Sequence, residues 1–178
     1  MNIIKFLKKS KSGFGILEIV VVTFIISIGM AGVLALVAQS MQAKYITKNN
    51  LIASQLAQEG LELVRNVRDE NWFNGDAFDL DISNGGTNTF IVDYEGRSSI
   101  DNAINNIDEA GAVLENRNDG TDDNFYRPDS TLGILTNFRR LITVVDQGDY
   151  LEVASTVRYN ISGGFRDYTA ETLLYDWY

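Results

Sequence analysis

The feature that most restricts the fold of this chain is an apolar run from Phe14 to Ala38 that contains a single charged residue, Glu18. About 20 apolar residues are enough to cross a lipid bilayer as a helix. A core helix of a soluble protein is the alternative, but such a helix is rarely apolar on every face over this length. The run therefore predicts a transmembrane helix over residues 14–38.

Charge on the two sides of the run predicts the orientation of this helix. The segment before the run contains four lysines and no acid, whereas the whole chain carries a net charge of −9. Because positive residues that flank a membrane helix stay in the cytoplasm, we expect a single-pass protein of the cytoplasmic (inner) membrane, with residues 39–178 exported. A signal peptide cut near Ser40 is the rival interpretation, although the run is longer than the apolar region of such a peptide.

Glu18 is an unusual residue for a membrane segment, because an ionisable group there costs a few kcal/mol on insertion scales and is a functional candidate by default. A cut after Gly13 would create an α-amine on Phe14, and residues 14 and 18 share one face of a helix. That amine would neutralise Glu18 either within the chain or in a neighbouring copy. A third interpretation is that the Glu18 side chain snorkels to the lipid headgroups.

The stretch "KKSKSGFGILEIVVV" resembles the leader and cleavage site of the type IV prepilins and pseudopilins. The shared features are a short basic leader, Gly13 at the cut, Phe14 as the first mature residue, Glu18 five residues into the mature chain, and a long apolar run. The resemblance implies that a prepilin peptidase removes residues 1–13 as a cytoplasmic leader and N-methylates Phe14. It also implies that Glu18 supports the recruitment and assembly of subunits.

The helical pattern continues beyond the membrane segment. Apolar residues recur at intervals of three, four and seven from Ile46 to Val67, which is the spacing of one helix face. This expected apolar stripe consists of Ile46, Ile52, Ala53, Leu56, Ala57, Gly60, Leu63, Val64 and Val67. We therefore predict one helix over residues 14–70, whose amphipathic second half, residues 39–70, needs a sheet to cover its stripe.

From residue 71 the pattern changes to the two-residue period of strands. The predicted strands are Thr89–Tyr94, Phe138–Val145, Tyr150–Ile161 and Phe165–Trp177, with a further hairpin turning at Asp119-Gly120. Strict alternation of apolar and polar residues signals an antiparallel sheet with one dry face, which is the natural cover for the helix stripe. The sequence thus predicts an α+β fold, with one long N-terminal helix packed on the antiparallel sheet of a β-rich globular head, residues 71–178.

This architecture is also the one that the pilin resemblance implies. The family often closes its C-terminal region with a disulfide, but this chain contains no cysteine. We therefore expect pairing of the last strand within the sheet to hold the C-terminal end.

Composition limits the chemistry of the head. The chain contains no cysteine and no histidine, so Cys–His and Ser–His catalysis are excluded, and we do not expect an enzyme. The excess of acids over Lys and Arg does not indicate a nucleic-acid partner.

No cofactor is expected, apart from calcium as a weak candidate. Asp119, Asp122 and Asp123 offer the oxygen ligands that calcium accepts, and a solvated acidic turn is the alternative. Asp76, Asp79 and Asp81 form a second, weaker cluster.

The resemblance implies a structural subunit of a type IV pilus-like filament that polymerises through its N-terminal helix. The expected partners are the prepilin peptidase, other pilin subunits, the membrane before assembly, and the inner-membrane assembly machinery. Such a filament lies outside the cell or in the periplasm. The alternatives are a minor pilin or pseudopilin, acting in priming, at a tip, in adhesion, in DNA uptake or in type II secretion, or a single-pass anchored domain that never polymerises.

Overall fold

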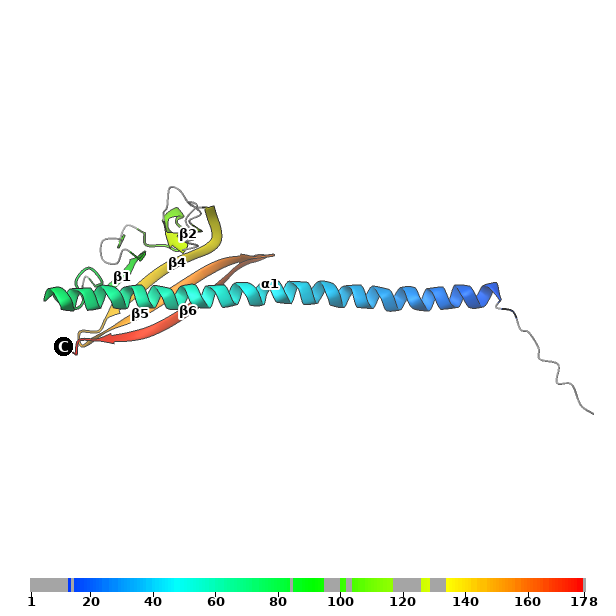
Figure 1. Cartoon of the computed structure of the whole chain (residues 1–178), viewed down its shortest axis with the longest axis horizontal. Coiled ribbons are helices and arrows are strands. Elements are labelled where there is room, and N and C mark those ends of the chain that lie inside the picture. Colours follow the sequence, from blue (N-terminus) through cyan, green and yellow to red (C-terminus); the bar gives the residue numbers. More distant parts are fainter. Residues whose placement is uncertain are drawn as a thin grey trace, which may run out of the picture. The chain divides into compact units, whose positions relative to one another are not determined.

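The computed structural model describes Gly13 and residues 15–83, 85–94, 100–101, 104–116, 126–128 and 134–177. Its elements, in chain order, are the helix α1 (Ile16–Asn74), strand β1 (Thr87–Phe90), the short 3-10 helix η2 (Ala110–Ala112), and strands β2 (Val113–Asn116), β3 (Tyr126–Pro128), β4 (Ile134–Asp146), β5 (Tyr150–Ile161) and β6 (Gly164–Tyr175) (Figure 1). The chain divides into two compact units, residues 1–45 and 46–178.

In the first unit the structure describes the beginning of α1. The helix begins at Ile16, two residues after the predicted start, and Phe14 lies outside the described residues. Every described residue from Gly15 to Tyr45 is exposed. The predicted apolar helix is therefore present, and its described residues are exposed.

Among the described residues of the second unit, six antiparallel strands form one sheet, with β3-β2-β4-β5-β6 as neighbours in this order and β1 paired with β4. One edge of β4 is shared, because β2 pairs with its first half and β1 with its second half. The other edge of β4 pairs with β5, which in turn pairs with β6 along the whole length of both strands. The turns between these long strands contain Gly148 (φ 88°) and Gly163 (φ 104°), backbone conformations that favour glycine.

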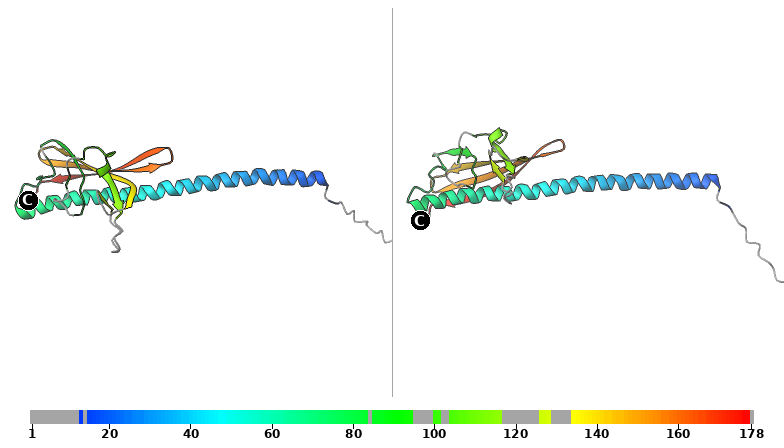
Figure 2. Two further views of the ribbon diagram at one scale, coloured as in Figure 1. Left: turned by 90° about the horizontal axis from the view of Figure 1, so that it is seen from above. Right: turned by 45° about the horizontal axis from the view of Figure 1, so that its top comes forward.

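The second half of α1 lies along one face of this sheet (Figures 1 and 2). Helix residues and inward-facing strand residues share two buried clusters. The first joins Val64 and Val67 to Ile142, Val144 and neighbouring residues. The second joins further stripe residues to strand residues, and includes Ala53, Leu56, Ala57, Leu114, Phe138, Val157 and Tyr159. The predicted α+β fold, with a helix stripe on the dry face of an antiparallel sheet, is confirmed.

The predicted elements differ from the observed ones mainly at their ends. Strand β5 has the predicted bounds, whereas β4 begins four residues before the predicted start, at Ile134. Strand β1 is displaced towards the N-terminus by its pairing with the end of β4. Strands β2 and β3 form the expected hairpin, and its turn at Asp119-Gly120 lies outside the described residues.

Helix α1 ends at Asn74 rather than at residue 70, so the head begins inside its last turn. The side chain of Asn71, which is buried in this last part of the helix, donates hydrogen bonds to the carbonyls of Phe78 (3.3 Å) and Leu80 (2.8 Å) and so ties the helix end to the following loop. Near the C-terminus, Leu174 of β6 is buried in the first cluster. The C-terminal strand is thus held by pairing and packing, as expected for a chain without disulfides.

Candidate assembly surface

The most unusual surface of the molecule is the first half of α1. Large apolar side chains are open to solvent along it, among them Ile16, Leu17, Phe24, Met30 and Leu36, which are 63% to 83% exposed. The helix is long and apolar enough to cross a membrane, a property that it shares with signal sequences. Soluble monomers rarely expose continuous apolar surface of this extent, so this half of the helix needs lipid or other protein to cover it.

The hydroxyl groups within this apolar surface are satisfied by the helix itself. The Thr23 hydroxyl lies 2.9 Å from the carbonyl oxygens of both Ile19 and Val20, and the Ser27 hydroxyl donates to the Thr23 carbonyl at 2.7 Å. Such bonds to carbonyls three or four residues earlier remove the need for water. The two hydroxyls therefore suit a hydrocarbon environment, where unsatisfied polar groups cost several kcal/mol.

Glu18 differs from these hydroxyls. It lies in the first turn of α1, and its backbone N–H donates to the carbonyl of Gly15 at 3.0 Å. The N-terminal end of a helix carries partial positive charge, which favours a carboxylate there. No ion pair or hydrogen bond joins the Glu18 side chain to any residue of the described part. The carboxylate is therefore the one charged group on the apolar surface, and it still requires a partner.

The remaining predicted processing residues lie just before α1. Gly13 is exposed, and no side or main chain lies within 4 Å of the position that a Cβ would take there. Phe14 lies outside the described residues, so the predicted pairing between its amine and Glu18 stays a prediction.

The calcium candidates Asp119, Asp122 and Asp123 also lie outside the described residues. The weaker cluster of Asp76, Asp79 and Asp81 is described, and within the described ranges no group of three or more acidic residues is placed to hold a metal ion.

The head contains a buried arginine that the sequence reasoning missed. Arg140 on β4 is 2% exposed and donates hydrogen bonds to the carbonyls of Leu56 (3.2 Å) and Val92 (3.0 Å) and to the carboxylate of Glu59 (3.1 Å). Burial lowers its pKa, and the Glu59 carboxylate opposes that shift. Arg140 therefore fastens α1 to the sheet and to the segment after β1. Arg140 lies two positions from each of the buried residues Phe138 and Ile142 on β4, and residues two apart on a strand face the same side of the sheet. This spacing is the signal that predicts an inward position for Arg140.

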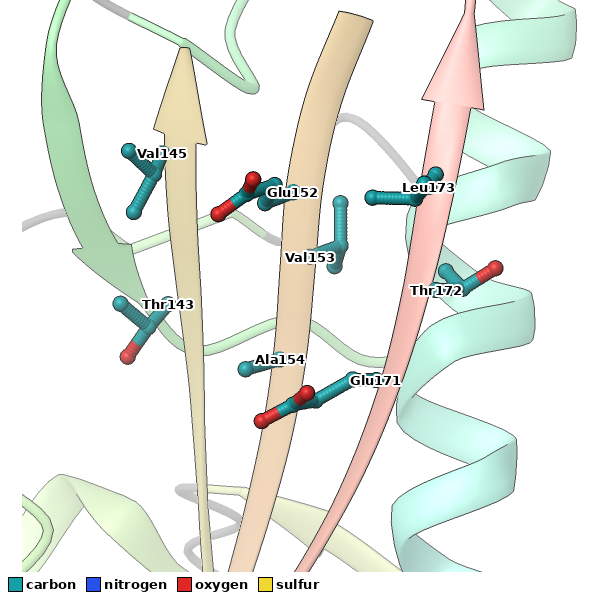
Figure 3. A pocket seen from close by; sticks show the side chains of 8 residues that line it. All are labelled: Thr143, Val145, Glu152, Val153, Ala154, Glu171, Thr172 and Leu173. Atoms are coloured by element: carbon teal, nitrogen blue, oxygen red, sulfur yellow. The ribbon is translucent and has the colours of Figure 1, made fainter. Parts of the chain in front are cut away.

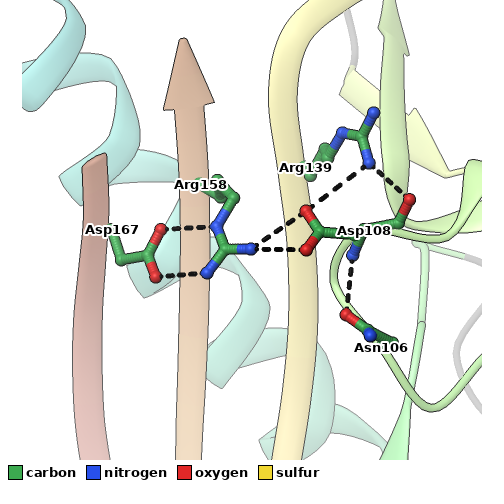
Figure 4. Close-up of polar contacts among 5 residues, drawn as sticks. All are labelled: Asn106, Asp108, Arg139, Arg158 and Asp167. Atoms are coloured by element: carbon green, nitrogen blue, oxygen red, sulfur yellow. Dashed lines mark hydrogen bonds and ion pairs between the residues drawn. The ribbon is translucent and has the colours of Figure 1, made fainter. Parts of the chain in front are cut away.

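A second polar network lies on the opposite face of the sheet (Figure 4). Arg158 on β5 binds both carboxylate oxygens of Asp108 at 2.9 Å, and two further guanidinium nitrogens bind Asp167 on β6 at 2.7 Å each. Hydrogen bonding from Arg158 lowers the pKa of Asp167. Arg139 on β4 donates to the backbone carbonyl of Asp108 at 2.6 Å. The network thus ties the segment that precedes η2 to three strands.

The same outer face carries a shallow hollow of about 500 Å³. Figure 3 shows its lining on β4, β5 and β6, where Glu152 and Glu171 stand among the side chains of Thr143, Val145, Ala154 and Leu173. No arginine or lysine lines this hollow. It has neither a positive group for an anion nor an enclosed apolar cavity.

Comparison of the chain with known protein families, with characterised proteins and with solved structures gives no match.

Proposed function

We propose that this protein is a structural subunit of a type IV pilus-like filament, inserted in the membrane as a precursor and polymerised through the first half of α1. One observation carries the proposal: every described residue from Gly15 to Ala38 is exposed on a helix whose one charge in this range is Glu18, while the same helix further on packs against a folded head. The second half of α1 thus packs within the head, and the first half is available for contacts with lipid or with other protein chains.

The physical drive for assembly differs from that of a soluble complex. Lipid already covers apolar side chains, so sister helices gain little from the hydrophobic effect and associate through packing and polar contacts. An unpaired carboxylate in lipid costs a few kcal/mol, and pairing Glu18 with a positive group relieves that cost. Glu18 therefore supplies both a driving force and a fixed register between helices that would otherwise slide.

The positive group that we propose is the α-amine of Phe14, released by a prepilin peptidase that cuts after Gly13 and methylates the new N-terminus. The exposure of Gly13 supports this step, because a peptidase needs open access to the chain. The precursor crosses the inner membrane once with its N-terminus in the cytoplasm. The inner-membrane machinery then assembles the subunits into an extracellular or periplasmic filament.

Mass spectrometry of the mature N-terminus tests the processing step. A chain that begins with N-methylated Phe14 supports the proposal. A chain that still begins at Met1, or that begins near Ser40, overturns it. A chain that begins near Ser40 would identify the apolar run as a signal peptide. A chain that still begins at Met1 would leave a single-pass anchored domain that does not polymerise.

Substitution of Glu18 tests the assembly step. Glu18→Ala is expected to leave membrane insertion and cleavage intact and to reduce filament yield, scored by electron microscopy of sheared filaments. Ser27→Ala is the matched control, because it removes a polar group from the same exposed half of the helix whose bond is satisfied internally. Equal filament yields for both variants and the unchanged chain would contradict the role of Glu18. Filament abundance also separates a major subunit from a minor pilin or pseudopilin.

A further inference from the structure

Three aromatic side chains converge where the end of α1 meets the end of the chain. Trp72 and Trp177 contact edge to face, with ring centres 5.2 Å apart and planes at 81°. Phe73 is 91% exposed and Trp177 is 71% exposed. With Arg68 and Asp69 they line a hollow of about 380 Å³. Single exposed aromatics are common, but a cluster from two distant segments around one hollow marks an interaction site.

Neighbouring groups hold Trp72 in place. The Arg68 guanidinium lies over the Trp72 ring, 4.4 Å from its centre. Two nitrogens of that guanidinium, Nε and Nη2, donate to Oδ1 of Asp69 at 2.9 and 2.8 Å. The Arg68 side chain is only 8% exposed. Because Trp72 is fixed between Arg68 and Trp177, ligand binding would order few further groups, which favours affinity.

The charges around the hollow restrict the ligand. A cationic ligand would compete with Arg68, which already occupies the cation–π position on Trp72. An anionic ligand would meet a guanidinium that is already paired with Asp69, and the Asp69 carboxylate would repel it. The same carboxylate disfavours docking of a second copy of this acidic chain through this end. A neutral ligand fits these charges best.

The hollow also requires a ligand with two kinds of surface. The exposed ring of Trp177 and that of Phe73 offer flat apolar contact. Beside them, Asp69 is half exposed, and the described residues donate to its Oδ1 but not to its Oδ2. A pyranose ring has an apolar C–H face that stacks on aromatic rings and hydroxyl groups that donate to a carboxylate. We propose that this end of the head, defined by Arg68, Asp69, Trp72, Phe73 and Trp177, binds a neutral saccharide. This site does not depend on filament assembly.

Tryptophan fluorescence, excited at a wavelength beyond the tyrosine absorption band, reports on this site, because Trp72 and Trp177 are the two tryptophans of the chain. The full chain would be purified in a detergent without a sugar headgroup and titrated with three neutral saccharides, cellotetraose, fully N-acetylated chitotetraose and maltotetraose. A saturable change in fluorescence with at least one of them is expected. The absence of saturation with all three at tens of millimolar would overturn the proposal. A change that follows protein concentration instead of saccharide concentration would indicate an interface between copies, and would overturn it as well.

Two variants and a control locate the site. Phe73→Ala should weaken binding of the responsive saccharide about tenfold or more, because it removes a stacking surface. Asp69→Asn keeps all the rings and should weaken binding through the hydroxyl contact alone. Phe165→Ala is the matched control, since Phe165 is 59% exposed at the β5–β6 turn, far along the sheet. Equal affinities for the unchanged chain, Phe73→Ala and Asp69→Asn would place the saccharide elsewhere and reject this site.

Discussion

The backbone of Gly60 in α1 lies directly against the side-chain hydroxyl of Ser155 in β5. A Cβ on Gly60 would overlap the Ser155 oxygen and would lie 3.0 Å from both Arg140 Cδ and Ile142 Cδ1. The helix therefore approaches the sheet at a point where only a residue without a side chain fits. This close approach brings Arg140 within reach of two acceptors on α1.

Gly60→Ala tests this packing. Alanine stabilises a helix by about 1 kcal/mol relative to glycine, but overpacking a buried contact costs about 1 to 3 kcal/mol. We expect a net loss of about 1 kcal/mol in the free energy of unfolding of the head, measured by urea titration with circular dichroism. Gly32→Ala, where no atom lies within 4 Å of the new Cβ, should leave the unfolding of the head unchanged. A stabilised Gly60→Ala head would show that the helix moves away from the sheet at little cost.

Arg140→Leu tests the buried arginine. The change leaves the Val92 carbonyl without the donor that Arg140 supplies, and each buried unsatisfied group costs about 1 to 3 kcal/mol. We expect the free energy of unfolding to fall by about 2 to 4 kcal/mol, because three hydrogen bonds are lost together. The measurement is the urea midpoint of the head.

Arg139→Leu is the matched control for this change. Arg139 is the preceding residue on the same strand, on the other face of the sheet, where its side chain is 31% exposed. Its loss should cost less than about 1 kcal/mol, as expected for partly exposed polar contacts. If both leucine variants unfold at the same urea concentration, the assignment of inward and outward faces along β4 is wrong.

The ion pair between Arg158 and Asp167 predicts a pH dependence. Hydrogen bonding from Arg158 lowers the pKa of Asp167 below its ordinary value of 3.8. A depressed carboxyl pKa stabilises the folded state fully above the unfolded value, and this contribution is lost as the pH falls through the lower, folded value. The stabilisation is therefore present at neutral pH and disappears below pH 3.8. Because the Asp167 side chain is 42% exposed, solvent and salt weaken the effect.

Asp167→Asn should reveal this dependence in urea unfolding measured from pH 7 to pH 3. The variant should be modestly less stable than the unchanged chain at neutral pH, and the difference should shrink towards zero in the acid range. Asp149→Asn, which alters an exposed carboxylate that forms no ion pair with the described residues, should show no such convergence. A difference that stays constant down to pH 3 would mean that Asp167 does not titrate in this range.

The sequence predicted those elements whose pattern is strong and local. Strand β5 alternates buried and exposed residues almost without interruption, and its bounds were predicted correctly. The helix stripe was also found, because Ala53, Leu56, Val64 and Val67 keep one face of a helix. The short strand β1 was misplaced because its position is set by pairing with β4, more than 50 residues later.

Buried polar groups could not be predicted in the same way. A pattern of apolar residues treats every charged side chain as exposed, yet Arg140 is buried because partners from elsewhere in the fold satisfy it. Arg68 is also buried, with its guanidinium bound to the adjacent Asp69 and lying over the Trp72 ring. The acceptor Glu59 is 81 residues from Arg140 in the chain, and Asp108 is 50 residues from Arg158. The candidate assembly surface is the opposite case. There the sequence singles out Gly13 and Glu18, and the structure adds only that both residues are exposed.

We expect the head to fold without the first half of α1. Every buried core residue of the described chain lies at Ala53 or later, and the continuous apolar surface lies before residue 46. A truncated chain of residues 46–178 is therefore expected to be soluble without detergent, monomeric in sedimentation velocity, and cooperative in urea unfolding, as small single domains usually are. A second truncation, residues 58–178, removes Ala53, Leu56 and Ala57 from the second buried cluster, together with the carbonyl that binds Arg140. This shorter chain should lose cooperative unfolding. Aggregation of the 46–178 chain would mean that the head needs the first half of α1 to fold, and that the two halves of the helix do not have separate roles.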